Sequence, residues 1–286
     1  MKTRLAILLA FTLLLLSCSG GGSSASPAGT GTLDVLATDA PFARDLVTQA
    51  RISVTKITIH EDANANSGFR TIYDGVPVDL DLLDLQNGVT RALVHATLPV
   101  GDYRQMRLIV SGASLTLING NIYSTANGTL SLTSQGTSGF KVFIQPAIHV
   151  SSQLAASLLL DFDLSKTFHP IPANDALNAT SYKLMPVIKA CNLSSSGEIR
   201  GLVTKDDGLG HQIGVSGATV YILPPGELDP NNSVATTGSM PNGAYAVIGL
   251  DPGPYDILAT EAALQGRVNA QQVSTGNVTT VDVVIQ

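Results

Sequence analysis

The feature that most constrains this chain is a recurring alternation between short β-branched or apolar runs and residues that favour turns. Beyond Thr32 these runs are separated by Gly, Pro, Asn and Asp. With 13% charged residues and no Trp, the pattern suits short strands better than long helices. At 286 residues, the chain exceeds one domain of roughly 150 residues. The predicted fold class is all-β, with two β-sandwich domains in series.

Strands of the first domain are expected at the apolar runs, which are 32–38, 50–60, 69–73, 76–85, 103–118, 139–150, 154–163 and 181–190. In the second run, Ile52 and Val54 share one parity while Ile57 and Ile59 share the other. A uniform strand would turn one pair outward, so we predict a β-bulge near residues 55–56.

Two further segments carry local predictions. Asn119-Gly120 separates residues 114–118 (SLTLI) from 121–123 (NIY), and Asn-Gly readily adopts the positive φ angles of a tight hairpin turn. Residues 89–98 are short enough to fit either a helix or a strand, and we favour a strand.

The N-terminus has the order of a secretory signal peptide. Lys2 and Arg4 precede an apolar run over residues 5–16, which is too short for a comfortable membrane span. The following Leu-Leu-Ser-Cys resembles the bacterial lipobox, in which the cysteine receives diacylglycerol. This resemblance implies a signal peptide over residues 1–17 and lipidation of Cys18. The alternative is an ordinary signal peptide with an incidental cysteine.

Residues 18–30 are rich in Gly and Ser, so we expect a flexible tether to a membrane. Ser19 follows the cysteine where Asp would indicate inner-membrane retention, so a cell-envelope location is predicted, with the outer membrane favoured in a Gram-negative cell. A lipidated Cys18 leaves Cys191 as the only thiol. We expect no disulfide and an unreactive Cys191.

The charge of the chain argues against nucleic acid as a partner. The formal net charge is −6, and no dense Lys/Arg run follows Arg4. Binding to a phosphate backbone requires such a basic surface.

A group of motifs in the first domain resembles a lipoprotein family. The motifs begin at Gly31, Leu98, Arg107, Leu160 and Leu184, and they read GTLDVLATDAP, LPVGDY, RLIV, LDFD and LMPVI. In this order they resemble the family catalogued as domain of unknown function 4382. The resemblance places this domain at residues 31–191 and implies an extracytoplasmic β-rich fold without a known activity.

A polar linker at residues 192–197 precedes a second domain at residues 198–286. Its runs, which include GLVTKD from Gly201 and LDPGPYDILA from Leu250, resemble the carboxypeptidase regulatory-like domain. That resemblance implies a seven-stranded prealbumin-like sandwich, in which Tyr245 and Tyr255 would fill the core. Leu-x-x-Gly-x-Tyr occurs in both domains, at residues 98–103 and 250–255.

Chemistry is sparse in this sequence. It contains no nucleophile elbow, zinc-protease, phosphate-loop or dinucleotide motif, so we predict a protein that is not an enzyme and has no cofactor. Five histidines are scattered singly: His60, His95, His149, His169 and His211.

Asp161 and Asp163 are the candidate metal ligands. They flank Phe162, and side chains two apart on a strand share a face, where Ca²⁺ would relieve their repulsion. Asp79, Asp81 and Asp84 would form a second acidic face. The favoured alternative is a solvated outer face whose charges protect an edge strand, because no calcium loop accompanies either group.

Three functions remain open. The first is a lipid-anchored, non-enzymatic binding or spacer module, with envelope proteins as partners. The second is a surface polysaccharide-binding lipoprotein, for which Tyr123, Tyr221 and Phe140 are the candidate stacking residues. The third is an accessory subunit of an envelope peptidase or transport complex.

Overall fold

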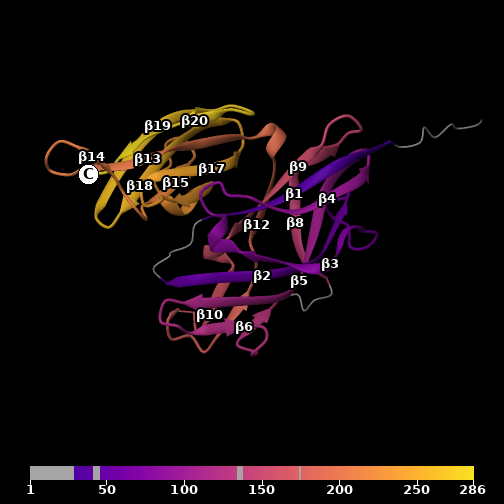
Figure 1. The fold of residues 1–286 in the computed structure, drawn as a ribbon. Helices are drawn as coiled ribbons and strands as arrows, with labels where there is room; N and C mark the ends of the chain where they lie inside the picture. Colours follow the sequence, from indigo (N-terminus) through magenta and orange to yellow (C-terminus); the bar gives the residue numbers. More distant parts are fainter. Residues whose placement is uncertain (1–28, 41–45, 134–137, 174) are drawn as a thin grey trace, which may run out of the picture.

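The computed structural model describes residues 29–40, 46–133, 138–173 and 175–286. The predicted signal peptide, Cys18 and nearly all of the predicted tether lie outside these ranges. Within them, no helix has the length and apolar character needed to cross a bilayer. The described residues fold into strands with four short 3₁₀ turns among them, and the predicted all-β class is confirmed (Figure 1).

Strands β1 to β12 precede the turn η3 along the chain. Their bounds are β1 (Thr30–Ala40), β2 (Val47–His60), β3 (Arg70–Asp81), β4 (Arg91–Pro99), β5 (Gly101–Leu117), β6 (Ile122–Ser124), β7 (Leu130–Leu132), β8 (Phe140–Val150), β9 (Ala156–Asp163), β10 (Phe168–Ile171), β11 (Ser181–Leu184) and β12 (Ile188–Asn192). The 3₁₀ turns among them are η1 (Leu82–Leu85), η2 (Leu164–Lys166) and η3 (Leu193–Ser195).

Strands β13 to β21 follow η3. Their bounds are β13 (Gly197–Asp206), β14 (Gln212–Gly214), β15 (Thr219–Leu223), β16 (Ala235–Gly238), β17 (Ala244–Leu250), β18 (Gly253–Glu261), β19 (Leu264–Val273), β20 (Val278–Thr280) and β21 (Val283–Val284), with η4 at Pro230–Asn232.

The first sandwich is one nine-stranded sheet folded over a single core. Its strand order is β3-β2-β5-β8-β12-β9-β1-β4, with β6 paired to β5. The two ends of the sheet, β3 and β4, come close together, so the sheet nearly closes on itself. Alternate residues of β1 point inward, and Leu33, Val35 and Ala37 are fully buried. A small sheet, β10-β11-β7, packs its apolar side chains onto the same core.

The predicted bulge in β2 is confirmed. The register of β2 against both β3 and β5 shifts between Val54 and Lys56, leaving Thr55 as the extra residue. Ile52, Val54, Ile57 and Ile59 are all buried as a result. Apolar residues of opposite parity thus share one core because the backbone inserts a residue between them.

Two predicted strand boundaries were wrong. The runs 69–73 and 76–85 form one strand, β3, which bulges opposite Thr55 and ends at η1. The run 181–190 breaks into β11 and β12 at residues 185–187. Pro186 explains the break, because proline has no N–H to donate to a ladder.

The hairpin at Asn119-Gly120 is present, and residues 91–99 form the favoured strand β4. Leu117 N donates to Asn121 O at 2.9 Å, which closes a three-residue loop. Only Gly120 adopts a positive φ, of 85°, as expected for a type I turn followed by a left-handed residue.

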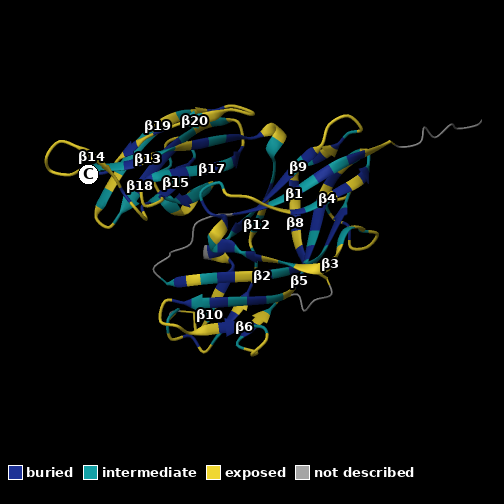
Figure 2. Ribbon diagram, in the orientation of Figure 1, coloured by how far each residue is buried: buried dark blue, intermediate teal, exposed yellow. Residues whose placement is uncertain are grey.

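The second sandwich has its own core between two sheets. One sheet contains β14-β13-β17 with β20 and β21 beside β13, and the other has the order β16-β15-β18-β19. Figure 2 shows the buried residues inside each sandwich. Nine strand segments occur where the resemblance implied seven. The count is higher partly because β20 and β21 pair with successive parts of β13 and can be regarded as one interrupted strand.

A buried ion pair fixes one side of the second sandwich. Asp256, which is 3% exposed, accepts hydrogen bonds from Arg267 Nη2 at 2.8 Å, Ala270 N at 2.7 Å and Gly226 N at 2.8 Å. Burial alone would raise the pKa of this carboxyl, but these hydrogen bonds and the charge of Arg267 hold the pKa below its usual value. The pair connects β18, β19 and the loop after β15.

The shared Leu-x-x-Gly-x-Tyr segments have matching geometry. Tyr103 Oη donates to Pro99 O at 3.0 Å, and Tyr255 Oη donates to Asp251 O at 2.9 Å, each four residues upstream. Leu98 and Leu250 are both 1% exposed. In each sandwich the tyrosine closes a turn between two consecutive strands that do not pair with each other. These are β4 and β5 in the first sandwich, and β17 and β18 in the second.

Candidate functional site at the junction of the two sandwiches

The most constrained site lies where the two sandwiches meet, at a loop between η1 and β4. Asn87 and Gly88 form its tip with positive φ angles of 60° and 73°. Thr38 is 5% exposed, and its hydroxyl lies within hydrogen-bond distance of Leu85 O (3.1 Å) and Val89 O (3.0 Å) on the two arms of the loop. Thr38 of β1 therefore connects both arms of the loop to the first sandwich.

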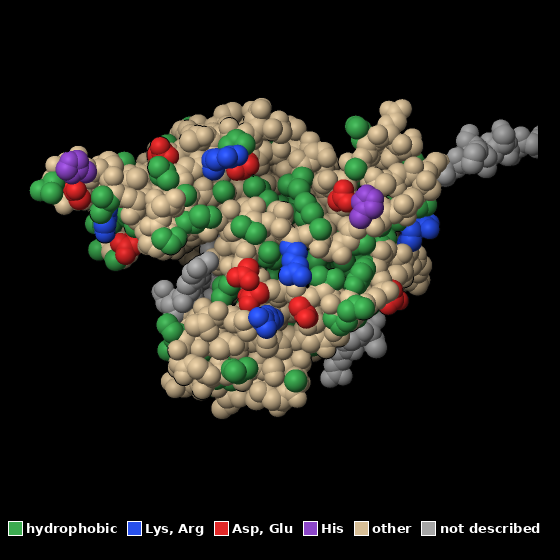
Figure 3. Space-filling model, viewed as in Figure 1, with side chains coloured by type: hydrophobic (Ala, Val, Ile, Leu, Met, Phe, Trp, Pro, Cys, Tyr) green, Lys and Arg blue, Asp and Glu red, His purple; other side chains and the backbone are tan. Residues whose placement is uncertain are grey.

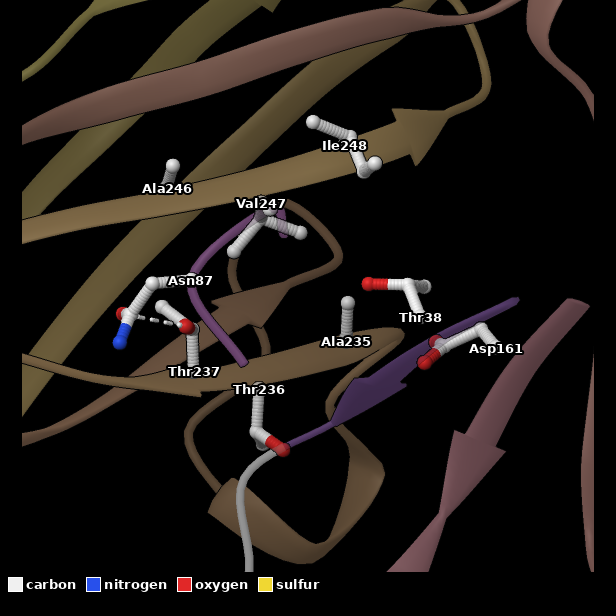
Figure 4. A pocket seen from close by; sticks show the side chains of 10 residues that line it. Thr38, Asn87, Asp161, Ala235, Thr236, Thr237, Ala246, Val247 and Ile248 are labelled. Atoms are coloured by element: carbon white, nitrogen blue, oxygen red, sulfur yellow. Dashed lines mark hydrogen bonds between the residues drawn. The ribbon is translucent and has the colours of Figure 1, made fainter. Parts of the chain in front are cut away.

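The tip of this loop seats on the second sandwich (Figure 4). Thr237 Oγ1 donates to Asn87 Oδ1 at 3.1 Å. A Cβ at Gly88 would lie 3.3 Å from the side chains of both Ala246 and Ile248, which is tighter than ordinary van der Waals contact. Glycine therefore serves two purposes at this position, the left-handed φ and the close approach.

A second contact lies alongside. A Cβ at Gly249 would lie 2.5 Å from Cys191 Sγ, so the thiol packs directly on the backbone of β17. Burial raises the pKa of Cys191 to about 12, and the nearby Lys189 lowers it by less. The thiol is protonated at neutral pH, in agreement with the expected lack of reactivity.

The hollow between the sandwiches is small. Its volume is about 20 Å³, and its polar lining includes Thr38, Asn87, Asp161 and Thr236. A cavity of roughly 10–15 Å³ holds one water molecule, so this hollow suits water and excludes an organic ligand. The junction is built for contact between the sandwiches.

The two candidate metal ligands lie on β9. Phe162 is buried between them, and Asp161 faces the junction while Asp163 pairs with Lys166 at 2.9 Å. The expectation that they protect an edge strand was wrong, because β9 lies between β1 and β12 inside the sheet. Among the described residues, no three His, Cys, Asp or Glu side chains group as a metal site. Calcium binding here stays a prediction.

Two of the other three acidic residues are engaged with β2. Asp79 Oδ1 accepts from Ser53 Oγ at 2.5 Å, and Asp81 lies 3.5 Å from Arg51 Nε. Asp84 is exposed in η1. Neighbouring strands thus account for two of the three carboxylates that were expected to form one acidic face.

The histidines do not converge. His95, His149 and His211 are exposed, and each pairs through Nδ1 with one carboxylate, from Asp34, Asp102 and Asp207 respectively. The hydrogen bond from His149 lowers the pKa of Asp102. His60 Nδ1 accepts from Asp62 N, and His169 lies beside Lys166 O.

The candidate stacking residues are largely internal. Tyr123 is 6% exposed and packs against Tyr182 at 4.7 Å between ring centroids, and Phe140 is 9% exposed. Their prediction as exposed stacking faces was wrong, because both fall on inward positions of β6 and β8. Tyr221 is half-buried on β15. Tyr245 is buried and Tyr255 half-buried, and both pack in the second core as expected.

A larger hollow, missed in the sequence, lies on the outer face of β2 and β5. It measures about 440 Å³, and Lys56 and Asp74 pair across 2.8 Å at its edge. Arg107 Cζ lies 4.1 Å from the centre of the Phe69 ring, and Arg107 Nη2 donates to Ala65 O at 3.2 Å. The bulge at Thr55 could have drawn attention to this region, since bulges often accompany functional sites.

The fold and the junction define a class of protein: an all-β chain of two joined sandwiches. The family model of the domain of unknown function DUF4382 matches residues 30–186. The chain therefore belongs to the DUF4382 family. No curated protein matches it in sequence.

Solved structures with some likeness include two bacterial pilins. The Bacillus anthracis TIE protein is 11% identical with a TM-score of 0.24, over 89% of this chain, which spans 40% of that protein. The minor pilin GBS52 of Streptococcus agalactiae is 11% identical with a TM-score of 0.25, over 88% of this chain and 94% of the pilin. The major pilin BcpA of Bacillus cereus is 10% identical with a TM-score of 0.24, over 90% of this chain and 70% of the pilin. These scores are too low to support an inference about this chain.

Proposed function

We propose that this chain is a lipid-anchored, non-enzymatic protein of the cell envelope, in which two sandwiches act together as a spacer or interaction module. The observation that carries the proposal is the junction. Its loop tip, its glycines and its packed thiol serve contact between the sandwiches, and its hollow is of water size. Envelope proteins are the partners we expect, and nucleic acid is not.

The proposal includes two assignments made from the sequence. Cys18 carries the lipid, in the outer membrane if the cell is Gram-negative. Residues 198–286 are a carboxypeptidase regulatory-like domain, which is supported by their sandwich form and by the core positions of Tyr245 and Tyr255. An accessory role beside an envelope peptidase or transporter fits the same assignment.

Intact mass and membrane fractionation test the anchor. We expect Cys18→Ala to lose the mass of the lipid and leave the membrane fraction, while Cys191→Ala, the matched cysteine control, keeps both. An unchanged mass and location for Cys18→Ala would refute the anchor. Turnover of an envelope substrate by the purified protein would refute the non-enzymatic assignment.

A second candidate function, polysaccharide binding, is favoured by the hollow on β2 and β5. Its rim offers a cation, a carboxylate and the hydroxyl of Thr55 to sugar hydroxyls, and its volume of about 440 Å³ accommodates small ligands. Binding to an array of defined oligosaccharides tests this function. We expect Lys56→Ala to weaken binding and the exposed control Lys183→Ala to leave it unchanged. An array without any bound glycan would remove this candidate.

A further inference from the structure

The described chain begins between two turns of the first sandwich. Val100 N donates to Gly29 O at 2.8 Å in the β4–β5 turn. A Cβ at Gly31 would lie 1.9 Å from Ser151 O in the β8–β9 loop, so only glycine lets β1 pass this close. The start of β1 is therefore fixed against both turns.

Those two turns expose apolar side chains. Leu154, in the β8–β9 loop, is 77% exposed, and Val100 is 37% exposed. Ser151 Oγ accepts from Leu154 N at 3.3 Å, which supports the loop from within. Residues 151–155 include no charged side chain, so nothing in this loop repels anionic headgroups.

Two exposed apolar loops of the molecule lie at opposite ends, and only one of them is near the start of β1. The β8–β9 loop and the start of β1 lie at the upper right of Figure 1, and hydrophobic side chains occur on this loop in Figure 3. The β13–β14 hairpin lies at the opposite end, and its Leu209 is 80% exposed. Of these two apolar loop tips, only the first adjoins the path toward Cys18.

We infer that the β8–β9 loop, through Leu154 and with Val100 beside it, docks on the bilayer that holds the Cys18 lipid. This inference rests on the proposed lipid anchor. Ten residues lie between Cys18 and Gly29, so the eleven Cα-to-Cα steps from one to the other span at most about 40 Å when fully extended. The second sandwich then points away from the membrane.

The tether makes this weak contact sufficient. One leucine and one valine do not hold a free protein on a bilayer, since stable attachment takes more apolar surface or a second signal. A short linker raises the effective concentration of the loop at the membrane to the order of millimolar. Docking is therefore expected for the lipidated chain and not for its unlipidated form.

The absence of Trp from the chain permits a direct test. Lipidated Leu154→Trp is reconstituted in phosphatidylethanolamine–phosphatidylglycerol vesicles with acyl-chain-brominated lipids as quenchers. We expect blue-shifted emission and loss of about half of the fluorescence, because the indole would sit at the acyl boundary. Leu209→Trp, of matched exposure, should stay unquenched. Val100→Trp is the second probe should Leu154→Trp fold poorly.

Intact mass and vesicle flotation are recorded on the same samples, so the two proposals fail separately. A chain that carries lipid and floats with vesicles, but whose Leu154→Trp and Val100→Trp indoles are not quenched, contradicts docking and leaves the anchor standing. Equal quenching of Leu209→Trp contradicts the orientation. A chain without lipid overturns the anchor and the docking together.

Discussion

At the scale of single residues, Asp256 is the most consequential polar group in the second sandwich. It is a buried carboxylate with one charged partner and two backbone donors. Removing one partner of such a pair leaves the other charge uncompensated.

We expect Asp256→Asn to lower the free energy of unfolding by roughly 3–5 kcal/mol in urea titrations at pH 7. Because the folded-state pKa of Asp256 is depressed, its contribution is present above the unfolded value of about 3.9 and is lost as pH falls through the folded value. The difference in free energy of unfolding between the native protein and Asp256→Asn should therefore become smaller below about pH 4. Exposed Asp84→Asn is the control, and an equal effect there would contradict the assignment.

At the scale of elements, the two tyrosine-closed turns make a paired prediction. Tyr103→Phe should cost about 1 kcal/mol, the usual net value of a hydrogen bond, because Pro99 O loses its donor beside a fully buried ring. Tyr255→Phe should cost less, since this half-buried position admits water as a replacement donor. Urea unfolding of both variants measures the difference, and the reverse order would contradict this account of the turns.

How much the sequence predicts also differs by element. The β2 bulge could be predicted because four apolar residues of mixed parity had to share one core. The length of β3 could not be predicted from the sequence. The middle of this strand bulges outward opposite Thr55, so its apolar residues do not alternate there between the core and the solvent. Asn87-Gly88 carries the same dipeptide signal as Asn119-Gly120, so its turn was predictable. Its partner was not, because Ala246 and Ile248 lie more than 150 residues away.

The candidate metal ligands show the same limit. Alternation along β9 correctly places Asp161 and Asp163 on the face opposite Phe162. It cannot say that β1 and β12 flank this strand, or that a second sandwich approaches Asp161. Such facts depend on strand order, which local periodicity does not encode.

At the scale of the whole molecule, the junction predicts a fixed orientation of the two sandwiches. Gly88→Val adds a side chain between Ala246 and Ile248 and should separate the sandwiches, raising the radius of gyration in small-angle X-ray scattering while circular dichroism stays unchanged. Gly128→Val is the matched control, because Gly128 has a φ of 75° with open space around it. If both variants expand the molecule, local strain and not the junction is responsible.

The thiol at the junction has a practical consequence. In the Cys18→Ala protein, Cys191 is the only sulfhydryl, and it packs on the backbone at Gly249. Cys191 is half-buried in the joined state, so its rate of modification by a thiol reagent should rise when the sandwiches separate, without any added label. The thiol of Cys191 thus reports separation of the two sandwiches, and Gly88→Val should increase the rate at which this thiol is modified.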